Sequence, residues 1–180
     1  MITIIQATNR PDSNTEFISK HIQELIKSIY HGSVGYVSMQ DLPPDILHVD
    51  PYDKEAMSGK LKFIQDEWMI PAEKFIWICP EYNGSYPGVV KVFIDALSVR
   101  LYTETFAFKK SALIGVTSGR SGNIRGMDHL AAVLIHMKSI IYPRLLPISR
   151  IVELMDENRQ IVHDQTLRIL DEHMKGFIAF

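Results

Sequence analysis

Two patterns of apolar residues alternate along the chain. Short runs of consecutive apolar residues are separated by longer segments in which apolar residues recur every three or four positions. The short runs are typical of strands buried on both faces, and the longer spacing is typical of helices with one apolar face. The runs predict five strands, over residues 2–7, 35–38, 75–79, 111–117 and 144–148. Strands that alternate with helices favour βαβ units, and therefore an α/β fold around a parallel sheet.

Five segments carry the helical period. They cover residues 13–29, 53–69, 87–97, 127–139 and 164–177. The first is marked by a Ser-x-x-Glu capping box, in which the Ser13 hydroxyl accepts a hydrogen bond from the backbone near Glu16 and the Glu16 carboxylate reaches back. Pro71 marks the end of the second helix, and Pro87 suits the first turn of the third.

The third helix is apolar on nearly all sides, with Lys91 and Asp95 as its one polar pair. A surface helix normally has more polar positions. Either the core covers both sides of this helix, or part of it meets another subunit. No repeat, low-complexity tract or long linker interrupts the pattern, so residues 1–180 are expected to form a single domain.

Composition narrows the class of partner. The chain has 180 residues and a net charge of −2, which gives no basic field for nucleic acid. No apolar stretch approaches the roughly 20 residues of a membrane span, and no targeting segment is expected. A small-molecule partner and no membrane association are therefore predicted.

The single cysteine and the histidines also exclude some chemistry. Cys79 cannot form an internal disulfide, which fits a reducing compartment such as the cytoplasm, and its apolar neighbours predict a buried core residue. The seven histidines form no HExxH motif or close pair, so no metal site is expected. There is no GxSxG motif for a nucleophilic serine.

Ligands of open parallel sheets bind at the carboxyl ends of the strands, which directs attention to three loops. The first, residues 8–15, offers hydroxyls, an amide and Arg10 just before a helix. Backbone N–H groups at a helix N-terminus, together with a guanidinium, suit a terminal phosphate. Ordinary capping by Ser13 and Asn14 is the alternative. Neither GxGxxG nor GxxxxGK[ST] is present.

The other two loops follow the third and fourth strands. Residues 80–88 contain two glycines, which allow close approach of a ligand, and Tyr82 and Tyr86, either of which can stack on a planar ring. Residues 117–126 are rich in glycine and basic, and can offer N–H groups and positive charge to an electron-rich ring. The alternative for that loop is a solvated, flexible segment.

Two motifs carry a family resemblance. They are Arg10-x-x-Ser13-x-Thr15 and Pro-Glu-Tyr-Asn-Gly-Ser-Tyr-Pro-Gly-Val-Val-Lys over 80–91, followed by Asp95 and Ser98. Together they resemble the NAD(P)H-dependent FMN reductases, a group that includes quinone, chromate and azo reductases, over roughly residues 2–148. The resemblance implies a flavodoxin-like three-layer sandwich, with a five-stranded parallel sheet in the order 2-1-3-4-5 and helices on both faces.

The resemblance also implies a set of cofactor-binding residues. The first loop would hold the FMN phosphate, and the other two would line the isoalloxazine and ribityl groups. The residues expected to bind FMN are Thr8, Arg10, Ser13, Asn14, Thr15, Pro80, Glu81, Tyr82, Asn83, Gly84, Thr117, Ser118 and Gly119. No catalytic side chain is required beyond the flavin, because the flavin itself accepts hydride.

Three departures from the family pattern stand out. Ala7-Thr8 replaces the frequent Gly-Ser, Thr15 stands where asparagine is frequent, and residues 120–125 replace a commoner run of glycines. The last change bears on the shape of the pocket for the nicotinamide or the acceptor. Arg120 and Arg125 offer contacts to a nucleotide 2′-phosphate, although exposed arginines in loops are more often solvated.

The expected function is that of an oxidoreductase. It would pass electrons from NADPH or NADH through FMN to a small acceptor (a quinone, a free flavin, an azo compound or a metal oxyanion) by a ping-pong mechanism. The alternative is a flavodoxin-like electron carrier or redox-sensing module without nucleotide turnover. The apolar third helix and the resemblance together predict a homodimer or tetramer.

Overall fold

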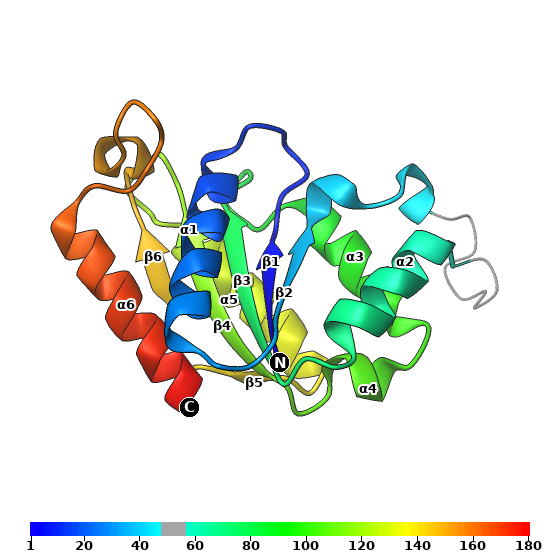
Figure 1. Cartoon of the computed structure of the whole chain (residues 1–180). Helices are drawn as coiled ribbons and strands as arrows, with labels where there is room; N and C mark the ends of the chain where they lie inside the picture. The colour runs from blue at the N-terminus through cyan, green and yellow to red at the C-terminus, as the bar shows by residue number, and fades with distance from the viewer. Residues whose placement is uncertain (48–56) are drawn as a thin grey trace.

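The structure, a computed structural model, describes residues 1–47 and 57–180 and is built on one parallel sheet (Figure 1). Its strands are β1 (Ile2–Gln6), β2 (Val34–Ser38), β3 (Lys74–Pro80), β4 (Lys110–Val116), β5 (Ile140–Ile141) and β6 (Leu146–Ile148). The strand order is β2-β1-β3-β4-β5, and every pairing is parallel. The predicted order and fold class are confirmed.

The fifth position in the sheet is shared by two short strands. β5 pairs with β4 at Lys110 and Ser111, and β6 pairs with β4 from Ile114 to Val116. The prediction of one strand over 144–148 is wrong for its first two residues, because β6 begins at Leu146. Pro143 lies between the two strands and has no N–H to donate, which fits the interruption of the ladder there.

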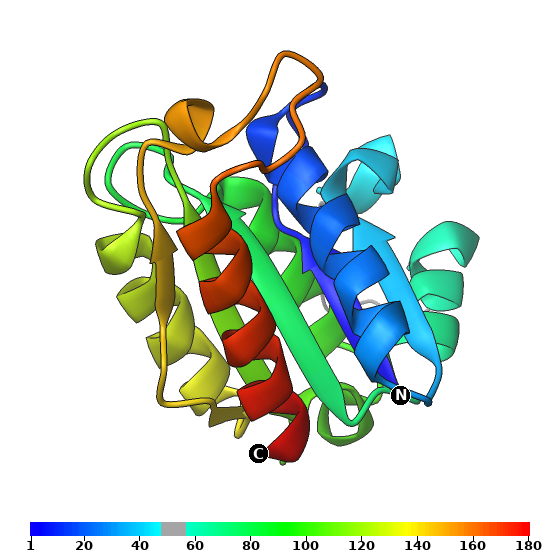
Figure 2. The ribbon, with the colours of Figure 1, turned by 60° about the vertical axis from the view of Figure 1, so that its left-hand side comes forward.

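Helices cover both faces of the sheet and form a three-layer sandwich (Figure 2). One face carries α1 (Asn14–Ile29) and α6 (Asp164–Ala179), and the other carries α2 (Gly59–Ile64), α3 (Gly88–Ser98) and α5 (Ile124–His136). Along α1 the buried Ile18, Ile22 and Ile26 follow the predicted spacing of four. None of the described helices is long and apolar enough to cross a membrane.

The second helix differs from its predicted form. Its expected start at residue 53 lies outside the described residues, and its described part is α2 followed by the π-helical turn η3 (Gln65–Met69). The buried Gln65 amide donates to the carbonyl oxygens of Leu97 (2.9 Å) and Arg100 (2.6 Å) and to the Thr105 hydroxyl (2.8 Å). This network ties the end of α3 and the short, unpredicted helix α4 (Tyr102–Phe106) to η3.

The capping box at the start of α1 is only half formed. The Ser13 Oγ accepts from the Glu16 backbone N–H at 3.2 Å, as predicted. The Glu16 carboxylate, however, accepts from Lys20 Nζ at 2.6 Å and Gln40 Nε2 at 3.2 Å, and within the described residues it makes no bond to the Ser13 N–H. A charged donor and a second amide therefore take the place of the predicted partner, and the Lys20 hydrogen bond holds the pKa of Glu16 below its usual value.

Among the residues that the structure describes, the core covers one side of α3. Val90, Phe93, Ile94 and Leu97 are buried, whereas three further apolar residues, Val89, Val92 and Ala96, are half-buried. Lys91 and Asp95 form an exposed ion pair of 2.7 Å on the remaining side. Contact of this helix with another subunit stays a prediction. Cys79 is fully buried, as expected of a core residue, and burial raises the pKa of its thiol.

Buried His173 on α6 gives a prediction about stability. Its ring packs edge-to-face on Tyr142 with centroids 5.3 Å apart, and its Nε2 has no partner among the described residues. Burial lowers its pKa to about 4, so the folded chain keeps it neutral at pH values where the unfolded chain, with a pKa near 6.5, takes up a proton. The free energy of unfolding should therefore fall as the pH drops from about 6.5 to 4, by on the order of 2 kcal/mol from this residue.

Substituting His173→Phe should flatten this part of the pH profile, because phenylalanine keeps an aromatic ring beside Tyr142 and cannot titrate. Urea unfolding followed by circular dichroism at pH 7, 5.5 and 4.5 measures the difference. Parallel losses of stability in the wild-type chain and the variant would assign the acid sensitivity to other groups.

Candidate cofactor site

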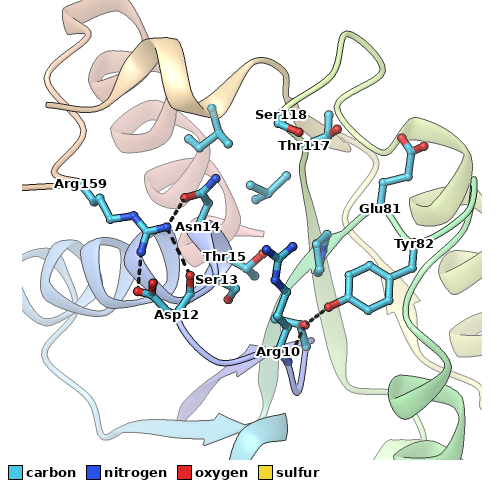
Figure 3. A pocket seen from close by; sticks show the side chains of 14 residues that line it. Arg10, Asp12, Ser13, Asn14, Thr15, Glu81, Tyr82, Thr117, Ser118 and Arg159 are labelled. Atoms are coloured by element: carbon cyan, nitrogen blue, oxygen red, sulfur yellow. Dashed lines mark hydrogen bonds and ion pairs between the residues drawn. The ribbon is translucent and has the colours of Figure 1, made fainter. Parts of the chain in front are cut away.

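A cavity opens where the loops after β1, β3 and β4 meet, at the carboxyl edge of the sheet (Figure 3). The chain runs from β1 outward to β2 and then back past β1 to β3, so β1 and β3 flank the point where the strand order reverses. Open α/β sheets bind their ligands at such points. The residues that line the cavity are Thr8, Arg10, Asp12, Ser13, Asn14, Thr15, Pro80, Glu81, Tyr82, Val116, Thr117, Ser118, Ile151 and Arg159.

The first loop brings an anion-binding group of donors to the cavity. Ser13 and Thr15 are buried at the start of α1, where the helix leaves its first backbone N–H groups without helical partners. The Ser13 oxygen accepts from Glu16, so its hydroxyl hydrogen is available to donate. The positive end of the α1 dipole and the Arg10 guanidinium add favourable potential for an anion.

Gln40 fastens this loop from the side of β2. Its amide donates to the Arg10 carbonyl oxygen at 3.1 Å and to the Glu16 carboxylate at 3.2 Å. The backbone of the loop is thus linked to the segment after β2 as well as to α1. Such links hold the donors in place before any ligand enters, which lowers the entropic cost of binding.

The second loop turns sharply at Asn83-Gly84. Both residues have positive φ, at 51° and 78°, and Tyr82 and Ser85 exchange backbone hydrogen bonds of 2.9 and 3.1 Å across the turn. Asn-Gly is the dipeptide best suited to a two-residue turn of this kind. The Tyr82 hydroxyl lies 2.7 Å from that of Thr8, so the second loop is hydrogen-bonded to the first (Figure 3).

The third loop folds back tightly on the sheet. A Cβ on Gly115 of β4 would come within 2.1 Å of the Gly122 carbonyl oxygen, and one on Gly122, whose φ is 58°, within 2.4 Å of Pro147. Both positions therefore require glycine. The buried Asn123 donates to the carbonyl oxygens of Cys79 (3.0 Å) and Pro80 (2.9 Å), which fixes the loop against the end of β3.

Part of the third loop is nevertheless exposed. Residues 118–121 face solvent, as in the solvated alternative, while Gly122 and Asn123 are buried. The Ser121 hydroxyl donates to the Glu81 carboxylate and so joins the third loop to the second. Glu81 and Ser121 also border a second hollow, together with Gly84, Ile124, Arg125 and Asp128.

Most of the predicted cofactor-binding residues meet at the cavity. Ten line it: Thr8, Arg10, Ser13, Asn14, Thr15, Pro80, Glu81, Tyr82, Thr117 and Ser118. Asn83, Gly84 and Gly119 do not line it, although Gly84 borders the second hollow. Tyr86 packs half-buried against the core on the α3 side, so of the two tyrosines considered for stacking only Tyr82 faces the cavity.

Four lining residues were not predicted. They are Asp12, Val116, Ile151 and Arg159. Val116 is the last residue of β4 and directly precedes Thr117, which was predicted because ligands bind at the carboxyl ends of parallel strands. The same rule would have found Val116 had the last residue of the strand been included. Ile151 and Arg159 follow the last strand, in and after the turn η4 (Ile151–Leu154), where no motif marks them.

The residues present fit FMN. Buried hydroxyls, helix N-terminal N–H groups and an arginine match a terminal phosphate, which accepts several charge-assisted hydrogen bonds. Tyr82 lies beside Arg10 on the side of the cavity away from Ser13 and Asn14, where its ring can flank a planar group (Figure 3). Anion-binding groups next to an aromatic side chain agree with a phosphorylated flavin.

Similar folds occur among solved flavoproteins. The FerB flavoenzyme NAD(P)H:(acceptor) oxidoreductase of Paracoccus denitrificans superposes with a TM-score of 0.81 at 21% identity, over 99% of this chain and 94% of that one. An FMN-dependent NADH-azoreductase of Bacillus anthracis in complex with FMN gives 0.63 at 12% identity, over 96% and 97%. At these identities the similarity concerns the fold alone.

Two reductases are similar to this chain in sequence. A 2-hydroxy-1,4-benzoquinone reductase of a Burkholderia species is 25% identical over 181 residues, covering 99% of this chain and 94% of that protein. An NAD(P)H-dependent FMN reductase of Pseudomonas aeruginosa is 32% identical over 107 residues, or 59% and 54% of the two chains. The family model described as NADPH-dependent FMN reductase matches residues 1–152, and the chain belongs to that family of FMN-dependent oxidoreductases.

Proposed function

We propose that the protein reduces a small quinone with NADPH or NADH, using FMN held in the cavity at the start of α1. The observation that carries this proposal is the meeting of the first-loop donors with the Tyr82 loop in one cavity, in a chain of this family. The quinone is supported by the Burkholderia relative, whose name gives a hydroxybenzoquinone as its substrate. A free flavin, an azo compound and a metal oxyanion are the competing acceptors.

The phosphate of FMN is assigned to the first loop. Arg10, Ser13 and Thr15 would bind its oxygens, with Thr8 and Asn14 beside them, because these residues converge where the α1 dipole is positive. FAD would place a bulky adenylate at this point. FMN is therefore the preferred form of the flavin.

The ring and ribityl groups are assigned to the second and third loops. Pro80, Glu81 and Tyr82 would flank them on one side, with Asn83 and Gly84 next to these, and Thr117, Ser118 and Gly119 on the other. Bound FMN supplies the redox chemistry, since it takes hydride from a nicotinamide and returns electrons to an acceptor. The side chains bind, orient and exclude water, and none is needed as an acid or base.

The second hollow is assigned to the nucleotide and the acceptor in turn. It shares Glu81 with the first cavity, and Arg125 in its wall is a cation that can bind the nucleotide phosphates.

We also place the protein in the cytoplasm, because its single, buried cysteine fits a reducing compartment.

Replacing Arg10 tests the phosphate assignment. Arg10→Ala removes charge-assisted hydrogen bonds worth about 1.5 to 3 kcal/mol each, so the dissociation constant for FMN should rise roughly ten- to a hundredfold. Riboflavin lacks the phosphate, and its affinity should stay unchanged. Titration calorimetry with both ligands measures this. The matched control is Arg168→Ala on the exposed side of α6, and an unchanged FMN affinity in Arg10→Ala would move the phosphate elsewhere.

Tyr82 should act by packing. Tyr82→Phe loses the hydrogen bond to Thr8 but keeps the ring, whereas Tyr82→Ala opens the wall of the cavity. We expect the rate of flavin reduction by NADPH, measured by stopped flow, to change less than about threefold in the first variant and about tenfold or more in the second. Equal, large losses in both variants would indicate a role for the hydroxyl.

Steady-state kinetics test the shared hollow. If nucleotide and acceptor occupy it alternately, double-reciprocal plots for NADPH at several benzoquinone concentrations should be parallel. Intersecting lines would show a ternary complex and contradict alternate occupancy. If neither NADPH nor NADH bleaches the FMN-loaded protein without oxygen, the protein is better described as an electron carrier.

A further inference from the structure

Arg159 reaches the first loop from the far end of the chain. It lies in a short hairpin closed by the antiparallel pairing of Met155 with Ile161. The Asp156 carboxylate accepts from the backbone N–H groups of Asn158 (2.9 Å) and Gln160 (2.8 Å) and so shapes the turn. Arg159 itself has a φ of 60°, a left-handed conformation that is rare for arginine.

The guanidinium of Arg159 is held against the loop that precedes α1 (Figure 3). Nη1 donates to Asp12 Oδ1 at 2.5 Å, and Nη2 donates to the Asp12 carbonyl oxygen at 3.3 Å and to Asn14 Oδ1 at 3.2 Å. Its Cζ lies over the Phe17 ring, 4.6 Å from the centroid. These contacts place a second positive charge in the wall that also contains Arg10.

This arrangement leaves donors for a ligand. A guanidinium has five N–H donors, and three hydrogen bonds to described residues account for three of them. The carboxylate partner is also weakly held, since the Asp12 side chain is 80% exposed and surface ion pairs contribute little. A dianion in the cavity competes well for such a guanidinium, because it carries more charge than Asp12 and lies where the α1 dipole adds to the attraction.

We propose that Arg159 is a second cation of the phosphate site and binds the phosphomonoester of FMN together with Arg10. This inference rests on the proposed function. The family model ends at residue 152, so the hairpin that carries Arg159 adds to the site from outside the matched segment. Asp12 forms an ion pair with Arg159, and the bound phosphate would share or replace that contact.

Substitutions at Arg159 and Asp12 distinguish two roles for Arg159, as a ligand of the phosphate or as a structural support of the loop. If Arg159 binds the phosphate, Arg159→Ala should weaken FMN binding roughly tenfold or more, and Asp12→Asn should leave it unchanged or tighten it, since a competing carboxylate is removed. If Arg159 only braces the loop through Asp12 and Asn14, removing the Asp12 charge should also weaken FMN binding, and Arg159→Ala should leave the salt dependence of that binding as it is in the wild-type chain.

The experiment is titration calorimetry of the purified full chain with FMN and with riboflavin, at 50 and 300 mM salt. Arg159→Ala should lose affinity for FMN alone, and its FMN affinity should depend less on salt than that of the wild-type chain. Arg159→Lys keeps the charge and should retain part of the affinity. Arg168→Ala on α6 is the matched control, and circular dichroism checks that each variant is folded.

Three results would overturn the inference. They are wild-type FMN affinity in Arg159→Ala, equal losses in Arg159→Ala and Asp12→Asn, and equal losses for FMN and riboflavin in Arg159→Ala. Failure of the proposed function looks different, because the wild-type chain would then bind no FMN at all.

Discussion

The parallel pairing of β1, β3 and β4 is the constraint on which the site depends. Gln6 is paired with Ile78, and Pro80 with Val116, so the three strands end at one edge of the sheet and release their loops side by side. The loops are then joined to one another: Tyr82 to Thr8, Ser121 to Glu81, and Asn123 to the end of β3. An offset of one residue in any pairing would turn the strand's side chains to the opposite face and break these links.

Two glycines let the backbone of the third loop pack closely on the sheet. Gly115 and Gly122 allow the third loop to lie directly on β4, which brings Asn123 within reach of β3. The loop is therefore ordered at its base and exposed at its tip. This combination suits a site in which one group is bound firmly while other reactants enter and leave.

The positive charge at the cavity comes from a few residues that the fold brings together, and the net charge of the chain does not predict it. The protein as a whole carries a net charge of −2, yet Arg10, Arg159 and the start of α1 all lie at the cavity. Asp12 offsets one of these charges. Because exposed charges are screened within about 10 Å at ordinary salt, such local pairing matters more for an anion in the cavity than the overall charge does.

The sequence by itself determined what depends on neighbours in the chain. Apolar periodicity predicted β1 to β4 and the helices α1, α3, α5 and α6, but not α4 or the division of the fifth strand. Ser13 marked the start of α1, and Asn83-Gly84 has the residue types that a two-residue turn needs. The loops after β1, β3 and β4 were also predicted as the ligand-binding loops, because ligands of open parallel sheets bind at the carboxyl ends of the strands.

Only the tertiary structure decided contacts between distant segments. Glu16 takes Gln40 and Lys20 as partners in place of Ser13, the fifth strand divides around Pro143, and Tyr86 packs into the core while Tyr82 faces the cavity. Arg159 lies 147 positions from Asp12 in the chain, and no local pattern reports that pairing. Such contacts depend on how whole elements pack, which spacing along the sequence does not encode.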